Sequence, residues 1–156
     1  NRFSLEETKS LVAQYKELWT EHRDDEGRMN GHVPSPKLGL SIKVYVAPTD
    51  KEAEEEARPA FRVWGEHISH LSRLAGQDGD RGREDFDAQR ANGTLIVGSP
   101  QSVIEQVRST VGTTGINYLL SSFAFGDLQP TQYMRSIDLF AEEVMPAFAS
   151  SPASTV

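Results

Sequence analysis

Apolar side chains recur along the chain at two spacings, and each spacing predicts a different kind of element. Strict alternation of apolar and polar residues predicts a strand over residues 38–47, and a mainly apolar run predicts another over residues 116–123. The short apolar run at residues 94–97 is interpreted as a strand-like turn. A spacing of three and four residues predicts helices over residues 4–22, 49–75, 84–91, 99–111 and 131–145. Strands that alternate with helices predict parallel pairing and an α/β fold.

Local signals define where several of these helices begin and end. Residues 4–7 (SLEE) and 49–52 (TDKE) have the pattern of capping boxes, in which two helix-end amides are satisfied reciprocally. Pro59 is expected to break or kink the second helix, and Pro146 to end the last one. The acidic run EAEEEA at residues 52–57 is interpreted as a solvated helix face.

Two predicted strands are too few for a stable parallel sheet, because both faces of such a sheet must be covered. The predicted helices outnumber the strands that they would cover. We therefore expect residues 1–148 to be one portion of a larger barrel, and residues 149–156 to be a flexible tail rich in small side chains. The start at Asn1, with a helix cap almost at once, leads us to expect a piece of a longer protein.

Composition narrows the class of protein. The 156 residues carry 16 basic and 23 acidic side chains, a net charge of −7, which argues against a binder of nucleic acid or anionic membranes. The absence of cysteine excludes disulfides and thiolate metal sites and fits a cytoplasmic protein. No run of about 18 apolar residues is present, so we expect no membrane span.

The stretch at residues 116–130 (INYLLSSFAFGDLQP) is the best candidate for a site. Its aliphatic strand changes at the far end to hydroxyl and aromatic side chains, at Ser121, Ser122, Phe123 and Phe125. These residues either line a small-molecule pocket or cap the core and bond to backbone, and the sequence leaves both readings open. No histidine or aspartate close in sequence suggests an activated serine nucleophile, so the catalytic residues stay unknown.

Two other patterns are weak candidates for binding sites. Residues 98–100 (GSP) present free amides at a helix start, which suits an anion, although every capped helix has them. His67 and His70 are spaced for one helix face, but no third ligand is visible, and we expect no metal site.

Longer motifs resemble a known family. Residues 95–107 (LIVGSPQSVIEQV) and 115–148 (GINYLLSSFAFGDLQPTQYMRSIDLFAEEVMPAF) resemble the C-terminal part of luciferase-like flavin-dependent monooxygenases. Residues 43–61 (KVYVAPTDKEAEEEARPAF) are similar to the strand and acidic helix that precede those motifs. Residues 4–18 (SLEETKSLVAQYKEL) resemble the helix one unit earlier. The match therefore covers nearly the whole chain.

The resemblance implies the last portion of a (β/α)8 TIM barrel, incomplete as a barrel. Residues 38–47 would be its seventh strand, residues 116–123 its eighth and residues 4–22 its sixth helix. The first five or six strands of the family have no counterpart here, and much of the cofactor site belongs to them. The cofactor-binding residues therefore stay unknown.

The resemblance also implies a chemistry and partners. Reduced FMN, often supplied by a separate flavin reductase, reacts with oxygen to form a flavin hydroperoxide that attacks a small organic substrate; some relatives use a deazaflavin. Many relatives form dimers. The candidates for the substrate-pocket wall are Tyr45, Ser121, Ser122, Phe123 and Phe125.

The chain by itself is expected to be inactive as such an enzyme. The alternative hypothesis is a non-catalytic interaction subunit, or a truncated relic, whose exposed strand edges pair with another chain.

Overall fold

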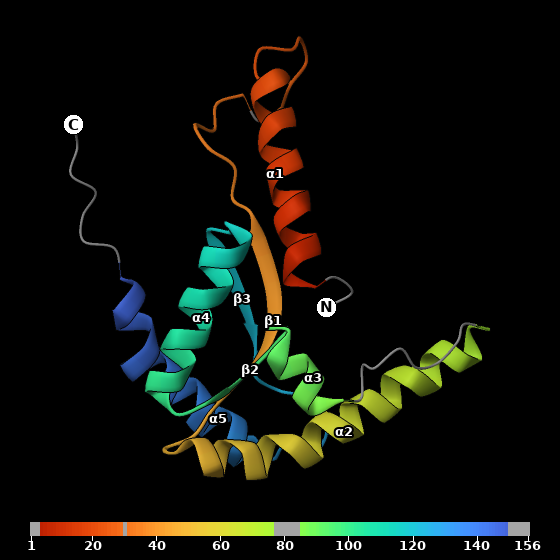
Figure 1. Cartoon of the computed structure of the whole chain (residues 1–156), viewed down its shortest axis with the longest axis vertical. Coiled ribbons are helices and arrows are strands. Elements are labelled where there is room, and N and C mark those ends of the chain that lie inside the picture. The colour runs from red at the N-terminus through yellow and green to blue at the C-terminus, as the bar shows by residue number, and fades with distance from the viewer. Residues whose placement is uncertain (1–3, 30, 77–84, 150–156) are drawn as a thin grey trace.

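The computed structural model describes residues 4–29, 31–76 and 85–149, which form a parallel sheet flanked by helices (Figure 1). Of the predicted tail at residues 149–156, all but the first residue lie outside this part of the chain. The elements are, in order, α1 (Leu5–Glu21), β1 (Gly39–Val46), α2 (Asp50–Leu74), α3 (Phe86–Ala91), β2 (Leu95–Gly98), α4 (Pro100–Thr114), β3 (Tyr118–Ser122) and α5 (Pro130–Leu139), followed by a π-helical turn (Phe140–Val144) and a 3₁₀ turn (Met145–Phe148).

The described sheet has three parallel strands in the order β2-β1-β3. The α/β class and the parallel pairing predicted from the sequence are confirmed. The expectation of only two strands is wrong, because the run interpreted as a turn is β2. All four residues of β2 are buried, so it lacks the alternation by which a short strand is recognised.

The sheet is open and does not close into a barrel. Residues 39–43 of β1 pair with β3, and residues 43–46 pair with β2 on the other side. β1 and β3 are therefore neighbours, as the seventh and eighth strands of a barrel are. β2 follows β1 in the chain but lies on the side of β1 away from β3, which differs from the sequential strand order of a (β/α)8 barrel.

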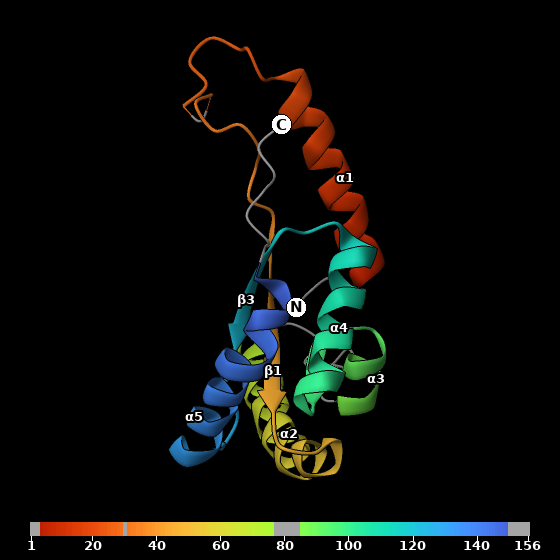
Figure 2. The same ribbon diagram turned by 90° about the vertical axis from the view of Figure 1, so that its left-hand side faces the viewer.

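The sheet has two unlike faces, which we call the α4 face and the α2 face. The α4 face carries Leu40, Ile42, Val44 and Val46 of β1, which are buried under α4 and the C-terminal helical turns. The α2 face carries the alternate residues of β1. Helix α2 runs across the carboxyl ends of the strands, so it covers that end of the α2 face (Figures 1 and 2).

The amino end of the α2 face is less covered. On β3, which the sequence predicts as a buried strand, the side chains of Tyr118 and Leu120 are 51% and 47% exposed. The physical reason is that α2 reaches only the carboxyl end of the sheet.

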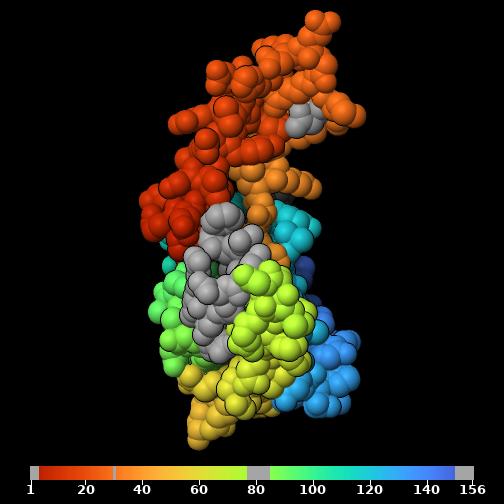
Figure 3. Space-filling view, turned by 90° about the vertical axis from the view of Figure 1, so that its right-hand side faces the viewer, coloured from red at the N-terminus to blue at the C-terminus, as the bar shows by residue number. Residues whose placement is uncertain are grey.

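Helix α1 packs against α4 near its start, and its far end projects away from the body (Figure 3). The ammonium group of Lys16 donates to the carbonyl of Gly115 at 3.2 Å, which ties the two helices together. None of the described helices has a stretch long and apolar enough to cross a membrane.

The predicted helix ends are only partly correct. The capping box of α1 is confirmed, because the amide of Ser4 donates to the Glu7 carboxylate at 2.8 Å and the amide of Glu7 to the Ser4 hydroxyl at 3.2 Å. At α2 the Thr49 hydroxyl accepts from the Glu52 amide, but the Glu52 carboxylate binds Arg135 at 3.0 Å instead of returning to the cap.

Neither proline ends its helical segment. Helix α2 continues through Pro59, which is exposed, because buried residues on both sides of it hold the helix on the core. Pro146 does not end the last helical segment either, since it lies in the first turn of the 3₁₀ segment, where no amide is needed.

The turn after β3 is held against α2 by a glycine. Gly126 has a φ of +59°, and a Cβ placed on it would overlap the carbonyl oxygen of Ala60 in α2. Both the left-handed backbone and the missing side chain are therefore required at this position.

We expect Gly126→Ala to lower the free energy of unfolding by about 2 kcal/mol or more, through backbone strain and overlap with α2. Urea unfolding followed by circular dichroism measures the change. The matched control is Gly112→Ala in α4, where a Cβ meets no atom within 4 Å; it should stabilise the protein by about 1 kcal/mol. Equal stability of the two variants would contradict the proposed packing.

Candidate functional site

A cavity of about 220 Å³ lies on the α2 face of the sheet, where α2 crosses it. Strands β1 and β3 provide its floor, α2 provides aromatic side chains, and α3 with the turn after it provides polar ones. The lining residues are Ser41, Lys43, Phe61, Trp64, Gln89, Thr94 and Ser122. Aromatic walls with a few polar groups are typical of small-molecule sites.

Strand geometry explains why three polar side chains meet at this cavity. Ser41 and Lys43 alternate along β1 and so point to the same face, and Ser122 is the register partner of Lys43 on β3. The sequence showed this alternation, but only the pairing brings Ser122 beside Lys43.

Lys43 is the charged residue of the cavity. Its ammonium nitrogen lies 3.5 Å from the centroid of the Trp64 ring, within the range of a cation–π contact. Within the described part of the chain, Lys43 makes neither a hydrogen bond nor an ion pair. Burial lowers the pKa of Lys43 below its usual range, because the charged form loses contact with water.

Two of the predicted pocket residues lie beneath this cavity. Tyr45 is fully buried, and Phe125 is nearly so. The ring of Phe125 makes edge-on contacts with Tyr45 and Phe61, at centroid distances of 6.4 and 6.3 Å. Tyr45 and Phe125 therefore form a packed layer next to the cavity, whereas Ser122 lines the cavity itself.

The other two predicted pocket residues lie on the opposite face of the sheet. Ser121 pairs with Ile42, whose side chain belongs to the α4 face. Phe123 packs edge-on against Phe140 at a centroid distance of 5.2 Å. Since successive strand residues alternate between faces, Ser121 and Ser122 point to opposite sides of the sheet.

The hydroxyl of Tyr45 is held by a partly buried network. It donates to the carboxylate of Glu56, and Arg135 of α5 binds the same carboxylate at 2.5 Å. Burial, with the neighbouring Glu56 carboxylate, raises the pKa of Tyr45, so this residue stays a neutral donor. The network joins β1, α2 and α5.

The helix start that the sequence suggested for anion binding is occupied by an anion of the chain itself. The carboxylate of Asp50 accepts from the amide of Ser99 at 2.6 Å and from the hydroxyl of Ser102 at 2.9 Å. These hydrogen bonds lower the pKa of Asp50. The amino end of α4 is therefore satisfied without a phosphate.

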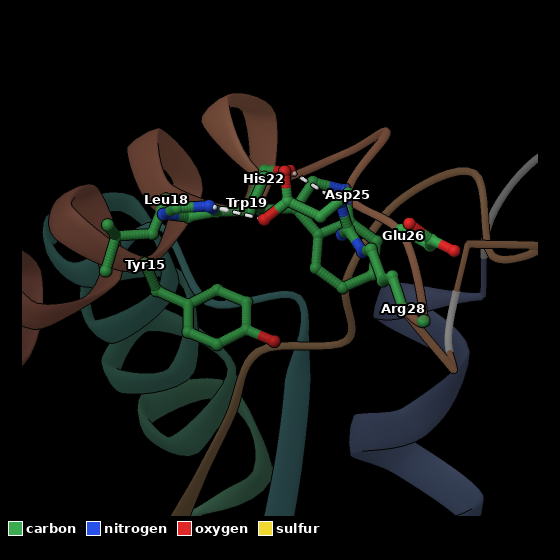
Figure 4. Close-up of a pocket in the computed structure, with 8 residues that line it drawn as sticks. Tyr15, Leu18, Trp19, His22, Asp25, Glu26 and Arg28 are labelled. Atoms are coloured by element: carbon green, nitrogen blue, oxygen red, sulfur yellow. Dashed lines mark hydrogen bonds and ion pairs between the residues drawn. The ribbon is translucent and has the colours of Figure 1, made fainter.

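A second hollow, of about 420 Å³, lies at the far end of α1 (Figure 4). Its walls come from one continuous segment, residues 15–28. Its polar groups pair with each other: Arg28 stacks on the Trp19 ring at 4.2 Å, and His22 lies 2.8 Å from Asp25. It holds none of the predicted site residues.

Sequence reasoning missed most of the cavity. Lys43 could have been found, because a lysine stands in a strand whose alternate positions are all apolar. Trp64, Gln89 and Thr94 gave no such signal, since their positions depend on how α2 and α3 fold over the sheet. In the described part of the chain, no three metal-ligating side chains gather at one place.

Comparison with known proteins gives consistent matches. A family model described as luciferase-like monooxygenase matches residues 1–117. Monooxygenase RslO1 from Streptomyces bottropensis is similar over 95% of this chain, with a TM-score of 0.67 and 19% identity. The oxygenating constituent of 3,6-diketocamphane monooxygenase from Pseudomonas putida, a type II Baeyer–Villiger enzyme in complex with FMN, is similar over 92%, with a TM-score of 0.57 and 26% identity.

The chain spans only 40% of the length of each of these two proteins. A riboflavin lyase, RcaE, whose structure holds a modified FMN and riboflavin, is similar with a TM-score of 0.50 and 16% identity, over 92% of this chain and 36% of its own. A search of curated proteins found no match.

We expect Tyr45→Phe to lower the free energy of unfolding by about 1–2 kcal/mol, because the Glu56 carboxylate loses a buried donor. Urea unfolding measures this change. Tyr118→Phe is the matched control: it removes a hydroxyl from a half-exposed side chain and should change stability by less than about 0.5 kcal/mol. Equal effects of the two changes would show that the Tyr45 hydroxyl contributes nothing specific.

We expect Asp50→Asn to destabilise the protein by about 1 kcal/mol at neutral pH, as for the loss of a helix cap. Because folding lowers the pKa of Asp50, its contribution is complete above the unfolded value of about 3.9 and disappears as the pH falls through the folded value. Thermal melts of both proteins should therefore converge in acid. Asp24→Asn, in the exposed loop after α1, is the control; a gap between wild type and Asp50→Asn that persists in acid would contradict this role.

Proposed function

The chain belongs to the luciferase-like monooxygenase family, as its motifs predicted, and we propose that it forms part of an enzyme that oxidises a small organic substrate with reduced FMN and oxygen. The observation that carries this proposal is the family match over residues 1–117. The 26% identity to a monooxygenase constituent in complex with FMN supports FMN over a deazaflavin. A flavin reductase that supplies reduced FMN is the partner that this chemistry needs.

The described residues around this cavity do not make a complete FMN site. The cavity of about 220 Å³ is below the range of about 300–1,000 Å³ usual for such ligands, and among the described residues that line it Lys43 is the one cation. The amino end of α4, where a phosphate could bind, is filled by Asp50. We therefore propose that the chain alone is inactive.

Within such an enzyme, we propose that the α2 face is one wall of the substrate pocket. Ser122 and Lys43 would face the substrate, and the packed layer of Tyr45 and Phe125 would hold the wall rigid. Ser121 and Phe123 would support the same strand from the α4 face. None of these residues is assigned the role of acid, base or nucleophile.

A second candidate function is that of a non-catalytic interaction subunit. The observation that favours it is the exposed apolar surface of β3, at Tyr118 and Leu120. Another chain that covered this surface would remove apolar area from water and stabilise the assembly.

The experiment that distinguishes the two functions is to isolate, with antibodies raised against the chain, the native polypeptide that contains this sequence. Its length, bound flavin and oxygen consumption are then measured. For the enzyme we expect a polypeptide more than twice as long, with FMN bound or FMN-dependent oxygen consumption when a flavin reductase is added. The chain expressed alone should not quench FMN fluorescence. A native polypeptide of the size of this chain, without flavin or oxygen consumption, would support the interaction subunit instead.

A further inference from the structure

Lys43 is a half-buried cation whose charge is not balanced by any residue in the described part of the chain. The described residues that line the cavity include no acidic side chain, and the ammonium group of Lys43 contacts the face of Trp64. Burial of a charge is costly unless the charge is paired or hydrogen-bonded. A cation–π contact offsets only part of that cost, about 0.5–2 kcal/mol.

We propose that this cavity binds the carboxylate of a small organic acid, with the ammonium group of Lys43 as the anion receptor. The hydroxyls of Ser41 and Ser122 open to the same cavity and can donate to a second oxygen. The rings of Phe61 and Trp64 provide apolar surface for the body of the ligand. Neither the polar nor the apolar part of the site is assigned by the family match.

The size of the cavity limits the ligand to about one ring. A cavity of roughly 150 Å³ can hold benzene, so about 220 Å³ admits a single-ring carboxylate and excludes a dinucleotide or a flavin. A phosphate group is less suitable, because one ammonium group and two hydroxyls provide little to balance a double charge. A metal ion is excluded by the cation already present.

The carboxylate site is inferred from the geometry of this chain alone. The identification of its ligand as the substrate of the enzyme rests, in addition, on the proposed function. Binding can therefore be measured on the chain without flavin. A failure of carboxylate binding would overturn this inference and leave the monooxygenase proposal untouched. The absence of flavin from the native protein would overturn the monooxygenase proposal and leave the carboxylate site untouched.

The experiment is a titration with benzoate, followed by the fluorescence of Trp64. The chain has two tryptophans, so Trp19→Phe, in α1, is introduced into every protein to leave Trp64 as the reporter. We expect saturable quenching by benzoate. Lys43→Met, which keeps the length of the side chain and removes its charge, should weaken the affinity about tenfold or more, because a hydrogen bond to a charged group is lost.

Lys51→Met is the matched control, since it removes a lysine from the exposed start of α2, where the ammonium group is 3.8 Å from Glu55. It should bind benzoate as well as the parent does. Circular dichroism establishes that each variant is folded. Benzamide, which has the same shape without the charge, gives a second measurement on the parent protein and should bind about tenfold more weakly.

Three results would overturn the proposal. The first is the absence of saturable quenching by benzoate in the parent protein. The second is equal affinity of the parent for benzoate and benzamide, which decides the question even if Lys43→Met does not fold. The third is an equal loss of affinity in Lys43→Met and Lys51→Met, which would indicate a general effect of net charge.

Discussion

The position of α2 depends on the partly buried network at the carboxyl end of β1. The hydroxyl of Tyr45 donates to Glu56 of α2, and Arg135 of α5 binds both Glu56 and Glu52. Three elements that are distant in the chain are thereby joined at one point. Because Phe61 and Trp64 lie further along α2, the same network determines where aromatic rings meet the sheet and, with them, where the cavity over Lys43 forms.

The acidic start of α2 is held against its neighbours by pairs with basic side chains, although the chain has a net charge of −7. The sequence indicated a solvated face, but most of these carboxylates bind within the chain. Asp50 caps α4, and Glu54 pairs with Arg58 and Arg90 at 2.5 and 3.1 Å. Glu52 and Glu56 pair with Arg135, and Glu55 pairs with Lys51. Partly exposed pairs contribute little one by one, so their main effect is to define the register of α2 against its neighbours.

Periodicity predicted the elements well because each depends on residues close in sequence. The family was also recognisable, since its motifs span a strand end and the helix that follows. Two features depended on distant contacts and were not predictable: the pairing of β2 with β1, and the division of Ser121 and Ser122 between two faces. The alternation of a strand was known, but which face each residue joins follows only from its partner strand.

The openness of the sheet affects the free-energy cost of placing the charge of Lys43 in the cavity. In the chain as described, the amino end of the α2 face is partly open, and water can reach the rim of the cavity beside Lys43. If further chain of a longer protein, of the kind that the relatives represent, covered Tyr118 and Leu120, it would exclude that water. The cost of the unbalanced charge would then rise, because a buried ammonium group without a counter-charge is strongly disfavoured. Either Lys43 would lose its proton or an anion would share the cavity, and a bound carboxylate satisfies the second condition with the side chains already in place.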